Sequence, residues 1–173
     1  MIFHQIKKFS ADIAFIDDKK NKIKYSEIVK LKNKIATFVK EKSLTIIISE
    51  NTIGSLMGYA SLSMLDVVLM PISQDLTDRK FETLITKYLP KFLWCKKNYY
   101  NEKIDNLFEP LFEYHNYVFF RSKKENYYKI KSNLFILLST SGSIGNPKCV
   151  KLSYGNIIKN SNLDRTGYII FKD

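Results

Sequence analysis

Residues 140–148 hold the groups in this sequence that are best suited to chemistry on an anion. The candidate ligand-binding residues are Thr140, Ser141, Gly142, Ser143, Gly145 and Lys148. The glycines let the backbone turn so that its N–H groups converge, the hydroxyls add further donors, and the lysine ammonium supplies a point charge. Together these features predict a loop that binds phosphate.

The elements that must position this loop are a strand on each side of it. Residues 134–138 form an apolar run that stops at Ser139, which predicts a short buried strand. Residues 149–152 predict a second short strand. The Walker pattern does not fit, because it needs four residues between its glycines and Lys-Ser/Thr at its end, whereas Cys149 follows Lys148. A dinucleotide fingerprint does not fit either, because it must open a helix.

The ordered string Thr-Ser-Gly-Ser-x-Gly-x-Pro-Lys resembles the signature loop of the adenylate-forming superfamily, which includes acyl- and aryl-CoA synthetases. The family pattern Thr-Ser-Gly-Ser/Thr-Thr-Gly-x-Pro-Lys-Gly is matched at Thr140, Ser141, Gly142, Ser143, Gly145, Pro147 and Lys148. Ile144 stands where the family mostly has Thr, and Cys149 where it mostly has Gly. The resemblance implies that the loop holds the β- and γ-phosphates of ATP, with Mg²⁺, while a carboxylate attacks the α-phosphate.

An ordinary turn is the alternative interpretation of the same residues, since Ser, Gly, Asn and Pro gather in turns between strands. The full ordered match between two expected strands favours the phosphate loop. Ser139, Ser141 and Ser143 lack the G-x-S-x-G elbow of a hydrolase nucleophile.

Strands and helices alternate in the part of the chain before the loop. We expect, in order, a hairpin over 11–25, a helix from Ser26 to about Lys42, a strand over 44–49, a helix over 52–65, a strand over 67–71, a helix from Thr77 to Pro90 and a strand over 92–95. This order predicts an α/β fold in which βαβ units form a mostly parallel sheet flanked by helices.

The family resemblance covers this region too, which is similar to the opening part of the large N-terminal domain of adenylate-forming enzymes. Asn51, the run 65–71 and Pro90 match, with Asp66 in place of a family Gly; a charge there is tolerable if it is solvated. After the loop, Ser153 is expected to cap a helix that runs to about Thr166, and Tyr154 stands where the family often has His.

Residues 96–132 lose the regular pattern and mix aromatic, lysine and asparagine residues. Such a mixture could stack on single-stranded nucleic acid. An irregular excursion whose aromatics pack on the sheet is the interpretation that we favour.

Composition suits one globular domain, with 173 residues of which 45% are hydrophobic. The formal charge is +11, from 28 basic and 17 acidic residues. The lysines are scattered, which favours a solvated surface over a nucleic-acid-binding stripe. No apolar run is long enough to span a membrane and no signal peptide is found, so we expect a cytoplasmic protein.

Cys95 and Cys149 are expected to be buried thiols, and His4 and His115 to be surface residues rather than metal ligands.

By resemblance, residues 1–173 form a partial N-terminal AMP-binding domain that ends shortly after the phosphate loop, with no C-terminal domain. The adenine-binding stretch, the ribose-binding Asp and the C-terminal catalytic Lys of the family are not found, so no catalytic residue is assigned. We expect a part of an ATP-dependent acid–thiol ligase, inactive alone. The carboxylic acid and the thiol acceptor, CoA or a carrier protein, would bind only with the missing part, which a second chain could supply.

Two alternatives remain open at this point. One is a non-enzymatic nucleotide- or phosphate-binding remnant that kept only the loop. The other is a basic nucleic-acid-binding module. The acid, the acceptor and the oligomeric state do not follow from the sequence.

Overall fold

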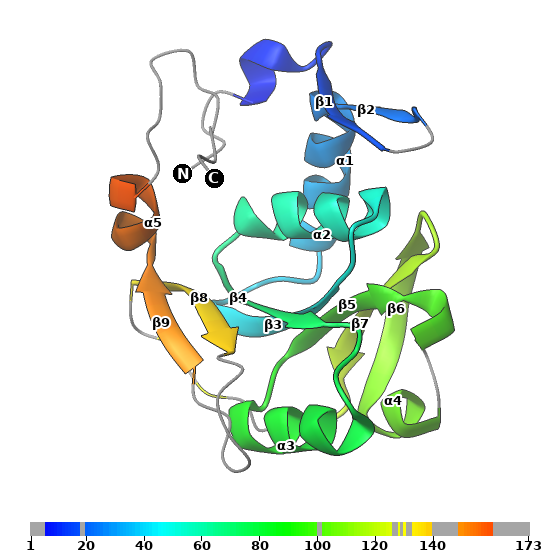
Figure 1. Cartoon of the computed structure of the whole chain (residues 1–173), viewed down its shortest axis with the longest axis vertical. Coiled ribbons are helices and arrows are strands. Elements are labelled where there is room, and N and C mark those ends of the chain that lie inside the picture. The colour runs from blue at the N-terminus through cyan, green and yellow to red at the C-terminus, as the bar shows by residue number, and fades with distance from the viewer. Residues whose placement is uncertain are drawn as a thin grey trace.

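The computed structural model describes residues 6–17, 20–99, 102–125, 128, 130, 133–139 and 149–160 (Figure 1). In these residues a seven-stranded sheet has the strand order β6-β7-β5-β3-β4-β8-β9. The strands are β3 Ser43–Ser49, β4 Val67–Ser73, β5 Phe92–Lys96, β6 Phe108–Tyr114, β7 Tyr117–Ser122, β8 Leu134–Ser139 and β9 Cys149–Ser153. The bounds of β8 and β9 confirm the two strands expected around the candidate phosphate loop.

The middle of the sheet is parallel and its two margins are antiparallel. β3 pairs in parallel with β4 and β5, and β8 joins β4 in parallel at Leu69↔Ile136. At the margins, β7 and β6 form one antiparallel hairpin beside β5, and β9 runs antiparallel to β8. The predicted mostly parallel α/β sheet is therefore confirmed.

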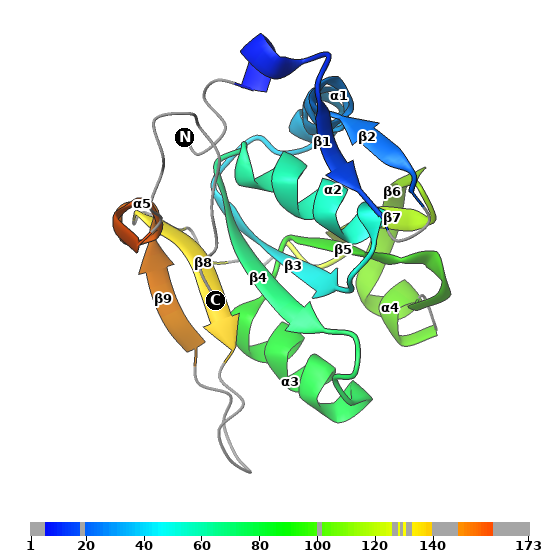
Figure 2. The same ribbon diagram turned by 45° about the horizontal axis from the view of Figure 1, so that its top comes forward.

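Helices cover both faces of this sheet, as Figures 1 and 2 show. α1 and α2 lie on one face, and α3 and α4 lie on the other. The helices are α1 Tyr25–Ala36, α2 Ile53–Ser63, α3 Asp78–Tyr88, α4 Glu102–Leu107 and α5 Tyr154–Asn160, with 3₁₀ turns η1 Ile6–Phe9 and η2 Lys97–Tyr99. None of the helices in the described residues is long and apolar enough to cross a membrane.

The isoleucines of β3 show why this sequence forms a two-sided sheet. Ile46, Ile47 and Ile48 have no exposed surface. Ile47 packs with the residues of α1 and α2, whereas Ile46 and Ile48 pack with those of α3 and α4. Successive side chains of a strand point to opposite faces, so an unbroken apolar run fits a strand with helices on both sides.

Strands β1 Ile13–Ile16 and β2 Lys22–Lys24 form a separate antiparallel hairpin, as expected. The prediction for the following helix is wrong at both ends. α1 begins at Tyr25 rather than after a Ser26 cap, because β2 leads directly into it and the Glu27 carboxylate accepts a hydrogen bond from the Lys24 N–H at 3.0 Å. It ends at Ala36, well before Lys42.

The region after β5 is more regular than expected. Residues 96–132 were predicted to be an irregular excursion, yet β6 and β7 extend the sheet as a hairpin. The aromatics of this region are buried as expected, but Tyr117, Phe119 and Phe120 are buried as part of the sheet itself, on β7, rather than packed on it from an excursion. Buried aromatics are not available to stack on nucleic acid.

Two glycines let α2 lie unusually close to the sheet. A Cβ atom at Gly54 would overlap the ring of Tyr117, and one at Gly58 would overlap the indole of Trp94. The Trp94 Nε1–H donates to the Gly54 carbonyl at 3.0 Å, and the two rings stack with centroids 5.8 Å apart. The closeness of α2 to β5 and β7 therefore depends on glycine at both positions.

The change Gly58→Ala tests this packing. Alanine favours helix formation by about 1 kcal/mol over glycine, but an added methyl group in a filled core costs about 1–3 kcal/mol or more. We expect a net loss of unfolding free energy, measured by urea denaturation. Gly155→Ala is the control, since a Cβ there meets only the Ser153 Oγ at 3.7 Å. A Gly58→Ala protein as stable as the control would contradict the close packing.

Candidate functional site

The six candidate phosphate-binding residues lie outside the described residues. Thr140, Ser141, Gly142, Ser143, Gly145 and Lys148 fall in the span 140–148, for which the structure gives no description. The structure does describe the two strands that bracket this span. These strands form the frame of the candidate site.

The ends of the loop are held side by side. β8 ends at Ser139 and β9 begins at Cys149, and these two residues are paired partners in the antiparallel ladder. Neighbouring strands are about 4.8 Å apart. Residues 140–148 therefore connect two points that the sheet fixes next to each other. Thr140 directly follows the paired residue Ser139, and Lys148 directly precedes the paired residue Cys149.

This connection leaves the sheet at the carboxyl ends of its parallel strands. β8 runs parallel to β4, so the chain leaves β8 after Ser139 at the same edge of the sheet as the carboxyl ends of β3 and β4. In open α/β sheets, ligands bind in the crevice outside the carboxyl ends of the strands. The loop therefore begins at the edge of the sheet where ligands bind in such folds.

A polar network occupies the same edge at the ends of β3 and β5. The Lys96 ammonium lies 3.1 Å from the Glu50 carboxylate, whose side chain is only 9% exposed. The Thr52 hydroxyl and the Tyr117 hydroxyl are 2.7 Å apart, and the Glu50 N–H donates to the Ser55 Oγ at 3.2 Å. Burial raises the pKa of Tyr117, and its hydrogen bond with Thr52 opposes that rise.

These groups are paired with one another and hold the first turn of α2 against β5 and β7. The Thr52 side chain also accepts from the Ser55 N–H, which caps α2. The sequence also carries a signal for this network. Glu50 and Thr52 follow one expected strand and Lys96 follows another, so their side chains had to meet at one edge of a parallel sheet.

The helix after β9 begins as predicted. The Asn156 N–H donates to the Ser153 Oγ at 3.2 Å, and the Ser153 N–H donates to the Asn156 Oδ1 at 2.9 Å, so the two residues cap α5 reciprocally. Tyr154 packs edge-on against Phe135 of β8, with centroids 5.6 Å apart. Residues 161–173 lie outside the described part, so the expected end of this helix near Thr166 stays a prediction.

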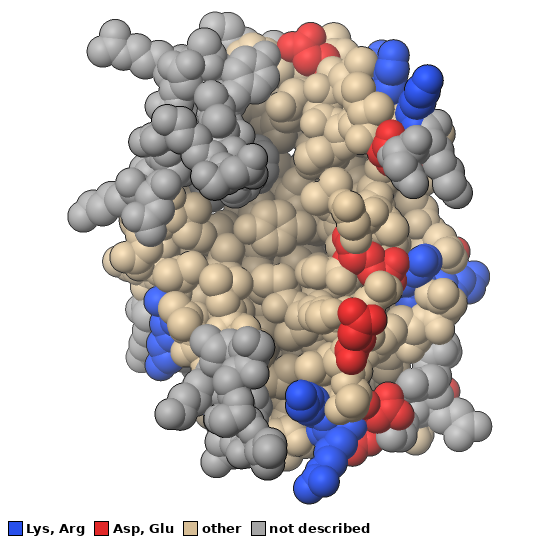
Figure 3. Space-filling view, viewed as in Figure 1, with Lys and Arg blue, Asp and Glu red and all other residues tan. Residues whose placement is uncertain are grey.

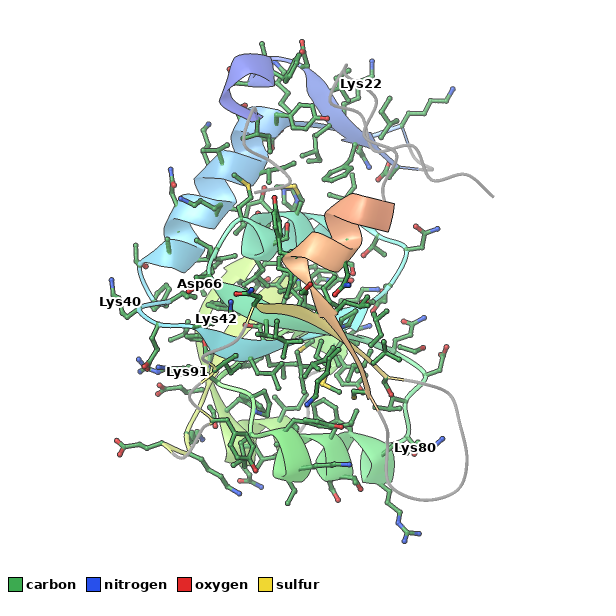
Figure 4. The ribbon with its side chains drawn as sticks, turned by 90° about the vertical axis from the view of Figure 1, so that its left-hand side faces the viewer. Lys22, Lys40, Lys42, Asp66, Lys80 and Lys91 are labelled. Carbon is green, nitrogen blue, oxygen red and sulfur yellow. The ribbon has the colours of Figure 1, made fainter. Side chains whose placement is uncertain are left out.

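Asp66 confirms one expected feature of the fold. Its side chain is 73% exposed and lies 3.1 Å from the Lys42 ammonium, and Figure 4 shows the two side chains pointing toward each other. The charge is solvated, so it does not disturb the turn before β4.

The described cations do not form a stripe for nucleic acid. Five of them make ion pairs with carboxylates: Lys42, Lys91, Lys96, Lys97 and Arg121. Figure 4 shows labelled lysines in separate regions, on the β1–β2 hairpin, near the start of β3 and on α3. Figure 3 shows one face on which the described lysines and arginines lie toward the margins, while acidic side chains lie just right of its centre.

The remaining candidates for chemistry are weak. His115 is exposed in the turn between β6 and β7, as expected, and His4 is outside the described residues. No group of three or more His, Cys, Asp or Glu able to hold a metal occurs among the residues with described positions. A hollow of about 530 Å³ is lined by Arg79, Glu82, Thr83, Thr86 and Lys87. All five belong to α3, so the hollow is the outer face of one helix.

Both cysteines are free thiols. Cys95 is buried, as expected, whereas Cys149 is only half-buried at the start of β9. Burial raises the pKa of the Cys95 thiol to about 12, and the nearby Glu50 carboxylate adds to the rise. The thiolate is the reactive form of cysteine, so Cys95 is protected in the folded protein.

The chain is similar in fold to several solved structures, among them a coenzyme A synthetase with bound AMP. O-succinylbenzoate coenzyme A synthetase (MenE) from Bacillus subtilis, in complex with AMP, has a TM-score of 0.67 at 15% identity over 92% of this chain and 43% of its own. Apo MatB from Rhodopseudomonas palustris has a TM-score of 0.66 at 15% identity, over 92% of this chain and 36% of its own.

A third similar structure is the N-terminal subdomain of NpsA from Klebsiella oxytoca, in complex with 3-hydroxyanthranilyl-AMSN. Its TM-score is 0.56 at 17% identity, over 88% of this chain and 39% of its own. No family model and no curated protein matches this sequence. The resemblance inferred from the loop is confirmed at the level of the fold, and the chain spans about two fifths of the length of these structures.

Alkylation tests the protected thiol. In a Cys149→Ser background, we expect Cys95 to resist iodoacetamide at pH 8 in the native protein and to react in urea, as measured by mass spectrometry. The unfolded thiol ionises from about pH 9, while the folded thiol keeps its proton to about pH 12. Its contribution to stability is therefore complete below about pH 9 and is lost toward pH 12. Equal alkylation rates with and without urea would contradict the burial.

Proposed function

We propose that this chain belongs to the adenylate-forming superfamily and carries the ATP phosphate-binding loop of an acyl-CoA synthetase-like ligase. One observation carries the proposal. A loop with the family's ordered residues connects β8 and β9 in a sheet whose fold is that of known adenylating enzymes. Two of those structures contain AMP or the acyl-adenylate OSB-AMP.

In this proposal the loop supplies donors to the phosphates of ATP. The backbone N–H groups near Gly142 and Gly145 converge on the phosphate oxygens, and the hydroxyls of Thr140, Ser141 and Ser143 add donors. Lys148 supplies the positive charge. The strands on either side fix the two ends of the loop at Ser139 and Cys149. Donors aimed at the developing charge would stabilise the transferring group electrostatically. Ile144 contributes no hydroxyl, so we expect one phosphate contact fewer than in the family pattern.

Mg²⁺ would arrive with the nucleotide phosphates. The described residues contain no acidic cluster to hold the metal by themselves. Magnesium is commonly bound through substrate phosphates and one or two carboxylates, so this finding fits a site completed elsewhere.

The chain alone is proposed to bind phosphate without adenylating an acid. Adenylation needs the acid, the α-phosphate and the metal in line, and positioning supplies most of its catalysis. The MenE chain is more than twice as long as the part of it that matches this chain. The carboxylic acid and the thiol acceptor are thus assigned to the part of the fold not present in residues 1–173. Free thiols at Cys95 and Cys149 suit a reducing compartment, and a cytoplasmic location is part of the proposal.

A thermal-shift titration with Mg-ATP and with pyrophosphate tests the loop. At a ligand concentration 100 times Kd, binding stabilises the folded state by about 2.7 kcal/mol, a rise in Tm of roughly 5–10 °C for a chain of this size. We expect this rise in the wild type and its loss in Lys148→Ala. Lys151→Ala, which removes an exposed lysine from the adjoining strand, is the control and should behave as the wild type. A Tm unmoved by either ligand, or moved equally in Lys148→Ala, would contradict the proposal.

A further inference from the structure

The two margins of the sheet differ in their protection against strand addition. β6 contains Pro110, which has no N–H to donate, and its register shifts between Pro110 and Phe112. The Glu109 carboxylate lies 2.5 Å from Arg121, and the Glu113 carboxylate lies 2.8 Å from Lys97. Proline, bulges and charges are the devices by which proteins keep an edge strand from pairing with another chain.

β9 has fewer of these devices: it carries one lysine, and its ladder with β8 shifts register between Leu134 and Ile136. Its sequence Cys-Val-Lys-Leu-Ser lacks proline, and β8 is its only strand neighbour in the part of the chain that the structure describes. Val150 is 45% exposed, and its partner Leu138 on β8 is 39% exposed. Residues directly opposite each other on neighbouring strands point to the same face. This edge therefore carries an exposed apolar pair on one face.

The other face of the same two strands is hollowed. A cavity of about 270 Å³ is lined by residues of β3, β8 and β9, of the C-terminal end of α3 and of the segment before β8, including Leu44, Tyr88, Ile130, Leu137, Cys149 and Lys151. Burial and the hydrogen bond with the Cys149 thiol raise the pKa of Tyr88 to about 12, so its hydroxyl stays protonated within this wall. Lys151 is the one charged residue of the lining. The cavity has room for an apolar side chain, and Cys149 and Lys151 of the edge strand β9 belong to its lining.

We propose that the β9 edge accepts a β-strand from a second polypeptide, apolar on both faces and flanked by acidic residues. An added strand would bond to the outer backbone of β9. Side chains that alternate along it would enter the cavity on one face and cover Leu138 and Val150 on the other. This is the mode in which backbone hydrogen bonds give affinity and pockets for alternate side chains give specificity.

Charge selects the partner. The chain has a formal charge of +11 and Lys151 lies on β9 itself, so a second copy would bring like charges together, whereas acidic flanks are attracted. The match covers 43% of the MenE chain, so that structure contains further polypeptide to which residues 1–173 have no counterpart. The idea that the partner completes an adenylating enzyme rests on the proposed function. Strand addition at β9 does not depend on it.

A synthetic peptide provides the test. The probe is a fluorescent nine-residue peptide with alternating valine and phenylalanine at its centre and two glutamates at each end, titrated with the chain by anisotropy. We expect binding to the wild type, a Kd at least tenfold higher for Val150→Lys, and an unchanged Kd for Ile16→Lys. Ile16 is the matched control because it is 60% exposed on the separate β1–β2 sheet. Leu138→Lys is the second variant, in case Val150→Lys fails to fold.

The peptide variants separate strand addition from simple stickiness. A peptide with proline at its central position should not bind, and one with lysines in place of the glutamates should bind at least tenfold more weakly. Equal binding by Val150→Lys and Ile16→Lys, or by the proline peptide, would overturn the proposal. Dimerisation of the chain that Val150→Lys abolishes would assign the edge to a second copy and overturn it too. Lys148→Ala should bind the peptide normally, so a failed phosphate site leaves this result unchanged.

Discussion

The contact of α2 with Trp94 and Tyr117 is the constraint that joins the parallel middle of the sheet to its antiparallel margin. Trp94 lies on β5 and Tyr117 on β7, so one helix is fixed against two strands of opposite direction. Glycine at positions 54 and 58 allows the rings to stack under the helix and the indole to donate to the helix backbone. The same contact places the first turn of α2, with Thr52, at the carboxyl edge where the candidate loop also emerges.

The fold could be predicted where local pattern and tertiary environment agree. The isoleucine run of β3 and the apolar run of β8 need burial on both faces, and a parallel sheet with helices on each side provides it. The β6–β7 hairpin was missed because Pro110 and two glutamates break the apolar alternation, although tertiary ion pairs satisfy those glutamates. The start of α1 was misplaced because strand pairing, rather than the serine signal, decides where the chain leaves β2.

Only part of the candidate site could likewise be predicted from the sequence. The strands on either side of the loop could be predicted from short apolar runs in the sequence. In the structure Ser139 pairs with Cys149, so the two ends of the loop lie next to each other. The network of Glu50, Lys96 and Thr52 depends on which strand ends are neighbours, so it needed the topology. The phosphate-binding roles of residues 140–148 remain a prediction from their order. A shared fold at 15% identity supports the position of such a loop but leaves its ligand to experiment.

An amide chemical-shift titration of the ¹⁵N-labelled chain with Mg-ATP would test the central claim most directly, because it locates the ligand residue by residue. A phosphate loop held between β8 and β9 predicts the largest shifts at Gly142 and Gly145, smaller ones at the flanking Ser139 and Cys149, and none in the β6–β7 hairpin. Shifts concentrated elsewhere, or a folded spectrum that ATP leaves unchanged, would contradict the assignment of this loop to ATP.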